Sequence, residues 1–301
     1  MASIALTAKE VGKEYVIEHA FEEQKKWTLE YISSPKYRER VKRALARGFF
    51  QKESLTKEET SILQTQKLEQ LYPTNINVSN VSENLVDEII QKRLSEVRNA
   101  KMGIVDVDPL LFFEGLYISP GGQKDLIDDP YLNNPYINSA NLKHELEQGK
   151  NILLARTAPE LTPVHELSHA STPSNNDLGQ KFQDIAGKRI QIQDANFTSP
   201  TEIKARLDSL RFELEKSGIY NPKSEDFNRS HIEKIIKDKT LKNSRAFRDL
   251  LKYVDKDNGD DLIWYMNNIA DIGNIGSISQ AELTTFLGRD IKAEDLTIAD
   301  A

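Results

Sequence analysis

Apolar residues recur along most of the chain at the spacing of amphipathic helices, which bury one face. One such stripe lies in a helix that begins near Glu83 and consists of Leu85, Ile89, Leu94 and Val97. A second stripe further along the chain consists of Ile203, Leu207, Leu210 and Leu214. The run from Ile152 to Ala155 differs, because four apolar residues in succession predict a buried strand. The pattern therefore predicts an α+β fold that is mainly helical and holds a small β-sheet.

The same pattern divides the chain into four parts. Residues 1–71 are predicted to be a charged helical arm, in which Ser34 and Pro35 start one helix and Gly48 ends it. Residues 72–82, rich in Asn and Ser, are predicted to be a linker, and residues 83–290 a globular domain. Residues 291–301 are predicted to be a loose acidic tail.

Within the globular domain, Met102 to Tyr117 is the second stretch that predicts β-structure. Residues 118–150 carry many prolines, glycines and asparagines, which predict a long irregular segment at the surface. Residues 243–254 and 262–272 predict a helical hairpin. The sheet is therefore expected in the middle of the chain, with helices before and after it.

Composition limits the function classes. The chain has a net charge of -7, which argues against general nucleic-acid binding, and no cysteine, which excludes disulfides and thiolate metal ligands. Charged residues come too early for a signal peptide, and no apolar run approaches the length of a membrane span. We therefore expect a protein of the cytoplasm that has no membrane partner.

His165, Glu166 and His169 form the pattern H-E-x-x-H, the one place where spacing alone prescribes a chemistry. On a helix, two histidines four residues apart leave the same face, where both imidazoles can bind one metal ion. Random placement of 5 His and 47 acidic residues in 301 would give this pattern about 0.01 times. A plain surface helix that carries two histidines is the competing interpretation.

The flanks of the motif favour a metal site. Thr162 is the predicted N-cap and Pro163 the first helical residue, so the motif opens a helix shortly after the strand. The positive end of this helix disfavours protonated histidine, which keeps His165 ready to bind a metal. Pro173 predicts that the helix ends within about two to three turns of its start.

Residues 152–206, with an edge strand, the motif helix and a later helix, resemble the core of the zincin metallopeptidases. The resemblance implies a zincin-like catalytic domain in which His165, His169 and a third side chain bind Zn²⁺, with water as the fourth ligand. It implies that Glu166 is the general base, which takes a proton from the zinc-bound water as this water attacks a peptide carbonyl. The substrate would be a peptide or protein, lying along the strand Ile152 to Ala155 as an added β-strand.

The third ligand decides the subfamily. The metzincin pattern is absent, because Thr172 and Asn175 stand where its glycine and third histidine would be. A glutamate on a downstream helix is the gluzincin solution, and Glu202 is the best candidate, with Arg206 placed to orient it. A capping box between Ser199 and Glu202 is the competing interpretation. The alternative third ligands are Glu213, Asp184, His231 and His144.

The residue that stabilises the oxyanion during hydrolysis has no evident motif downstream. By position the candidates are His231 and Tyr220, the latter just past a helix stop at Gly218. The predicted zinc ligands are thus His165, His169 and Glu202. The predicted catalytic residues are Glu166, His231 and Tyr220.

A second function class stays open, namely a structural or assembly protein that keeps a zincin-like metal site without turnover. The charged helices of residues 1–71 would suit attachment to a larger assembly. The general character of the chain is similar to proteins of bacteriophages or their hosts, which implies association with a virion as the alternative location. Turnover separates the two classes, because either one would bind zinc.

Overall fold

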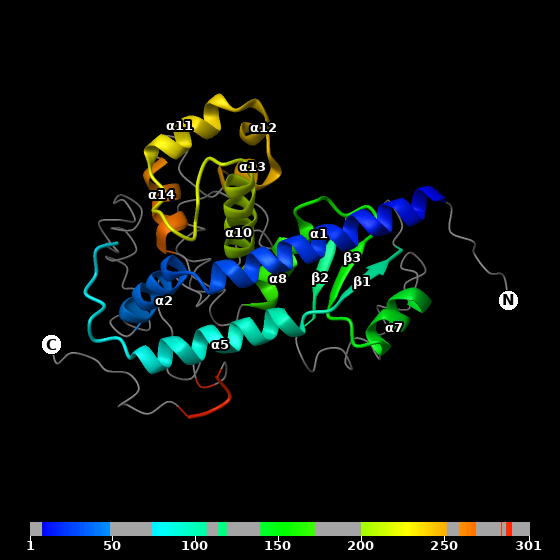
Figure 1. The fold of residues 1–301 in the computed structure, drawn as a ribbon, viewed down its shortest axis with the longest axis horizontal. Coiled ribbons are helices and arrows are strands. Elements are labelled where there is room, and N and C mark those ends of the chain that lie inside the picture. Colours follow the sequence, from blue (N-terminus) through cyan, green and yellow to red (C-terminus); the bar gives the residue numbers. More distant parts are fainter. Residues whose placement is uncertain are drawn as a thin grey trace, which may run out of the picture.

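The computed structural model describes residues 8–48, 74–106, 114–118, 139–171, 200–251, 259–268, 284 and 287–290 (Figure 1). These residues form a mainly helical fold with a small mixed sheet, as the apolar pattern predicts. The elements up to the end of the sheet are α1 (Ala8–Ile32), α2 (Pro35–Gly48), α5 (Glu83–Asn99), β1 (Met102–Val105), β2 (Gly115–Tyr117), α7 (Ser139–Glu147) and β3 (Ile152–Ala155). The helices that follow are α8 (Thr162–Ala170), α10 (Pro200–Lys216), α11 (Arg229–Lys237), α12 (Lys239–Lys242), α13 (Arg245–Leu251) and α14 (Gly259–Asn268).

The described strands form a sheet in the order β1-β3-β2. Strand β1 runs parallel to β3, with Met102 opposite Ile152, whereas β2 runs antiparallel, with Tyr117 opposite Ile152. All four residues of β3 are buried, because this strand lies in the centre of the sheet and both of its faces are covered. The predicted strand at 152–155 and the predicted β-structure within 102–117 are confirmed at these ranges.

Helices α1, α2 and α5 pack with β3 and α8 around a cluster of buried apolar side chains, which we call the N-terminal core. Figure 1 shows α1 and α5 running alongside each other, with α8 and the sheet next to them. Large buried side chains of this core include Phe21, Tyr31, Val41, Ile89, Leu154 and Leu167. Helix α2 has the predicted start and end, and α5 buries the predicted stripe.

Helix α10 carries its leucines into what we call the C-terminal core, shared with α11, α13 and α14. Its members include Leu207, Leu210, Leu214, Phe227, Phe247 and Trp264. Helix α13 lies within the predicted range 243–254, whereas α14 begins three residues before the predicted range 262–272 and overlaps it up to Asn268. Each packs against α10. Because α10 also packs against α8, it connects the C-terminal core to the motif helix.

The prediction of an irregular segment over residues 118–150 is wrong for its last part. Helix α7 occupies Ser139–Glu147, where Leu142 and Leu146 lie one turn apart and are both buried. Residues 119–138 lie outside the described residues, as do 49–73, Asp184 and the predicted tail at 291–301. The division of the chain into four parts stays a prediction. In the described residues no helix is both long and apolar enough to span a bilayer.

Candidate metal centre

The motif helix α8 begins one residue earlier than its sequence suggests, so Thr162 is its first helical residue and the N-cap prediction is wrong. The N-cap is Leu161, whose side chain cannot accept a hydrogen bond. A distant side chain takes this role, because Gln24 of α1 accepts a hydrogen bond from the Val164 N–H at 2.7 Å. The Gln24 amide also donates to the Glu160 carbonyl at 2.6 Å. Helix α1 therefore fixes where the motif helix starts.

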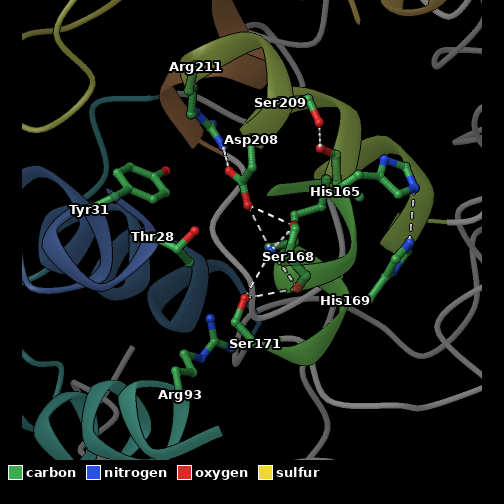
Figure 2. A network of polar contacts seen from close by, with 12 residues as sticks. Thr28, Tyr31, Arg93, His165, Ser168, His169, Ser171, Asp208, Ser209 and Arg211 are labelled. Atoms are coloured by element: carbon green, nitrogen blue, oxygen red, sulfur yellow. Dashed lines mark hydrogen bonds and ion pairs between the residues drawn. The ribbon is translucent and has the colours of Figure 1, made fainter. Parts of the chain in front are cut away.

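His165 and His169 face each other across one turn of α8, as Figure 2 shows. Their Nε2 atoms lie 3.2 Å apart. Glu202 of α10 approaches both imidazoles, with 3.3 Å from Oε2 to His165 Nε2 and 3.2 Å from Oε1 to His169 Nε2. All three side chains are half-buried, so each keeps part of its surface exposed to solvent.

The three side chains converge closely enough to hold a metal ion. Two donor atoms that each lie about 2.05 Å from one ion, at the tetrahedral angle, are about 3.3 Å apart. The separation between the Nε2 atoms of His165 and His169 is near this value. Glu202 contacts His165 with one oxygen and His169 with the other, and two imidazoles and a carboxylate are donors that Zn²⁺ accepts. In the described residues this is the group of His, Asp and Glu side chains that could surround an ion, and His144, Glu213 and His231 are not part of it.

The surroundings of Glu202 favour its ionised, negatively charged form. Burial raises the pKa of this carboxyl, but hydrogen bonds and charge from His165 and His169 lower the pKa by more, so the net shift is well below the usual range. Nη2 of Arg206 lies 3.9 Å from Glu202 Oε2, where the predicted orienting cation was expected. Ser199, the other half of the competing capping box, lies outside the described residues.

Glu166 points from α8 toward strand β2 and is buried, with 5% of its surface exposed. Its carboxylate accepts a hydrogen bond from the backbone N–H of Tyr117 and lies close against Gly115, where a Cβ atom would be 2.7 Å from Oε1. Burial raises the pKa of Glu166, and the negative charge of Glu202 raises this pKa further. The imidazoles of His165 and His169 lower the pKa, but the net shift is upward. A carboxylate with a raised pKa is a better proton acceptor than an exposed one.

Strand β3 is not the edge at which a substrate could add. Both of its sides are already paired, with β1 and with β2, so its backbone hydrogen bonds are used within the sheet. In the described part of the chain β2 has a strand partner on one side only, and Leu116 there is 38% exposed. Among the described residues the strand next to Glu166 that is paired on one side only is therefore Gly115–Tyr117, and not Ile152–Ala155 as expected from the sequence.

The sequence analysis missed a buried polar network between α8 and α10, drawn in Figure 2. Ser168 Oγ donates to Asp208 Oδ2 at 2.8 Å, and Lys204 Nζ donates to the Ser168 carbonyl at 2.9 Å. Arg211 donates to Asp208 Oδ1 at 2.7 Å. Burial lowers the pKa of Lys204 to about 8 against the raising effect of Asp208, while the cations lower the pKa of Asp208 despite its burial. The sequence does carry a signal for this network, because Lys204, Asp208 and Arg211 are three charged residues at helical spacing beside an apolar stripe.

The two candidates for the oxyanion role lie in the C-terminal core. Tyr220 Oη accepts a hydrogen bond from Arg40 at 2.9 Å. His231 Nδ1 accepts from the Asn228 N–H at 3.0 Å, which closes a capping box at the start of α11, and its ring stacks on Phe227. Both side chains therefore have structural partners, and we leave them out of the proposed site.

The resemblance to zincins thus rests on residues of this chain alone, which are the motif on α8 and the carboxylate that α10 brings to it. The chain was compared with protein-family models, with curated proteins and with solved structures. None of the three comparisons found a match.

Proposed function

We propose that this protein is a zinc-dependent metallopeptidase whose metal is held by His165, His169 and Glu202. The observation that carries the proposal is the convergence of three donor side chains from two helices, with the Nε2 atoms of His165 and His169 3.2 Å apart. The two oxygens of Glu202 lie 3.3 Å and 3.2 Å from these atoms. Bound there, Zn²⁺ would supply Lewis-acid polarisation of a carbonyl and an acidified water. We did not find a second cluster of this kind among the described residues.

Glu166 is proposed as the general base. It neighbours the first ligand on α8, is buried against β2 and has a raised pKa, so it can take a proton at neutral pH and return it to a leaving amine. In the described part of the chain β2 has a strand partner on one side only, so an extended peptide could pair as an added strand with backbone groups of β2 other than the Tyr117 N–H, which donates to Glu166. A peptide bound there would lie against the strand that contacts the Glu166 carboxylate.

The test is hydrolysis of a peptide library by protein that has been stripped with a chelator and reloaded with Zn²⁺, with new termini identified by mass spectrometry. Glu166→Gln should keep the metal and lose turnover by about 10²- to 10⁴-fold, the usual worth of a general base. Glu160→Gln, which changes an exposed carboxylate just before α8, is the matched control and should keep turnover. Equal turnover in wild type and Glu166→Gln would remove the base assignment.

One observation favours the alternative of a structural or assembly protein. The ligands come from α8 and α10, so an ion would cross-link the two helices that connect the N-terminal and C-terminal cores. A zinc-loaded protein that cuts no peptide, yet unfolds at a lower temperature after chelation, would support this alternative over the peptidase.

A further inference from the structure

Helices α8 and α10 are joined by buried hydrogen bonds as well as by the candidate metal ligands. Ser168 lies next to His169 in the sequence, and its hydroxyl donates to Asp208 of α10. Lys204, two residues after Glu202, donates to the Ser168 carbonyl and makes a further short contact with the Ser168 hydroxyl. Lys204, Ser168 and Asp208 are all at least nine-tenths buried.

Such contacts constrain the helices in a way that apolar packing does not. Leucines tolerate small sliding and rotation of one helix on another, whereas a buried carboxylate or ammonium loses its partner when the helix turns. One residue of α-helix corresponds to about 100° of rotation, so a slip of α10 would carry Glu202 away from the imidazoles. We call the buried contacts of Ser168 with Lys204 and Asp208 the Ser168 bridge. These contacts form in the same arrangement of α8 and α10 that brings Glu202 to His165 and His169.

We propose that Ser168 and Asp208, with Lys204, are positioning residues that set the register of α10 against α8 and so complete the metal site. The inference rests on the proposed metal ligands and goes beyond them, because it assigns residues that touch neither the metal nor a substrate. Arg211 holds Asp208 from its other oxygen, so the carboxylate cannot follow a displaced Ser168.

The chain supplies a matched control in Ser209. This residue is also buried, and its hydroxyl donates at 2.9 Å to the Ala205 carbonyl within α10, so it bridges nothing (Figure 2). Ser168→Ala and Ser209→Ala remove the same group from the same helix pair. A general effect of losing a buried hydroxyl appears in both variants, whereas a loss of register appears only in Ser168→Ala.

The experiment titrates metal-free full-length protein with Co²⁺ and records affinity and the visible absorption spectrum, which reports coordination geometry. Ser168→Ala should lower the Co²⁺ affinity by roughly 10-fold and change the spectrum, since loss of a group that orients a ligand costs about 10- to 100-fold. Ser209→Ala should match wild type. In a Glu202→Gln background, Ser168→Ala should have no further effect, because the bridge acts through Glu202.

The outcomes separate the two proposals. Wild-type affinity and spectrum in Ser168→Ala would overturn the positioning role and leave the metal site in place. An equal loss with and without Glu202 would also overturn it, because the bridge would then act on the histidine helix alone. Failure of wild type to bind Co²⁺ would remove the metal site and this role with it. Asp208→Asn gives a second test of the same bridge where it folds, and the milder Ser168→Ala decides where it does not.

Discussion

Oε1 of Glu202 lies 3.2 Å from Nε2 of His169, although the two residues belong to different helices. Helix α10 also carries Glu213, whose carboxyl is half-buried with a pKa raised by burial. Only Glu202 joins the histidine pair in the cluster found among the described residues. This difference between two glutamates of one helix gives a direct test of the ligand set.

Glu202→Ala should weaken Zn²⁺ binding by more than about 100-fold, since a lost ligand costs more than a lost partner of a ligand. Glu213→Ala is the control on the same helix and should bind Zn²⁺ as wild type does. Competition with a chelating dye measures both affinities. A larger loss in Glu213→Ala than in Glu202→Ala would mean that α10 supplies a different ligand.

Gly115 and Gly12 should respond in opposite directions to alanine. A Cβ at Gly115 would lie 2.7 Å from both Glu166 Oε1 and Thr162 Cγ2, so Gly115→Ala should destabilise the fold by about 1–3 kcal/mol and impair turnover. Gly12 lies on the exposed side of α1 with no atom within 4 Å of such a Cβ, so Gly12→Ala should stabilise by about 0.5–1 kcal/mol. Urea unfolding and a peptidase assay read the two effects. Unchanged turnover in Gly115→Ala would show that Glu166 can move without cost.

Gln24 should matter for the motif helix despite its distance in sequence. Gln24→Leu leaves the buried Val164 N–H without its acceptor, which should cost about 1–3 kcal/mol of unfolding free energy. Gln148→Leu, at an exposed position after α7, is the control and should change stability little. Thermal or urea unfolding compares them. Equal stability of the two variants would contradict the capping role of α1.

His231 should make stability depend on pH through its capping box. Burial lowers its pKa below the value of 6.5 expected in the unfolded chain, although Glu225 opposes the shift. A lowered folded-state pKa means that the stability contribution is full above about 6.5 and is lost as pH falls through the folded value. Protonation of Nδ1 removes the acceptor for the Asn228 N–H.

His231→Gln keeps an acceptor at the same helix position without titrating, because glutamine also serves in capping boxes. Urea midpoints of the metal-free protein between about pH 5 and pH 8 should therefore fall less steeply toward acid in His231→Gln than in wild type. A constant offset between the two curves would show that His231 does not titrate in this range.

The local parts of the site could be predicted from sequence, because they depend on neighbours along one helix or strand. The strand at 152–155 and the shared face of His165 and His169 follow from periodicity alone. The phase of the stripe in α10 also favoured Glu202, which approaches His165 in the structure.

The non-local parts could not be predicted in this way. Gln24 reaches the start of α8 from another helix, and no spacing rule connects a residue in α1 with a cap more than a hundred positions later. The central position of β3 in the sheet is an exception, because the sequence carried a signal for it. A continuous apolar run is typical of a strand that is covered on both faces and flanked by strands on both sides. The Ser168 bridge depends on how α8 and α10 meet, which only tertiary packing decides.

The most direct test of the central claim is an anomalous difference map at the zinc absorption edge, from crystals of full-length protein purified in the presence of Zn²⁺. The account predicts one strong peak bounded by His165 Nε2, His169 Nε2 and a Glu202 oxygen, at about 2.0–2.2 Å from each. No peak between these side chains, or a peak held by other residues, would contradict it.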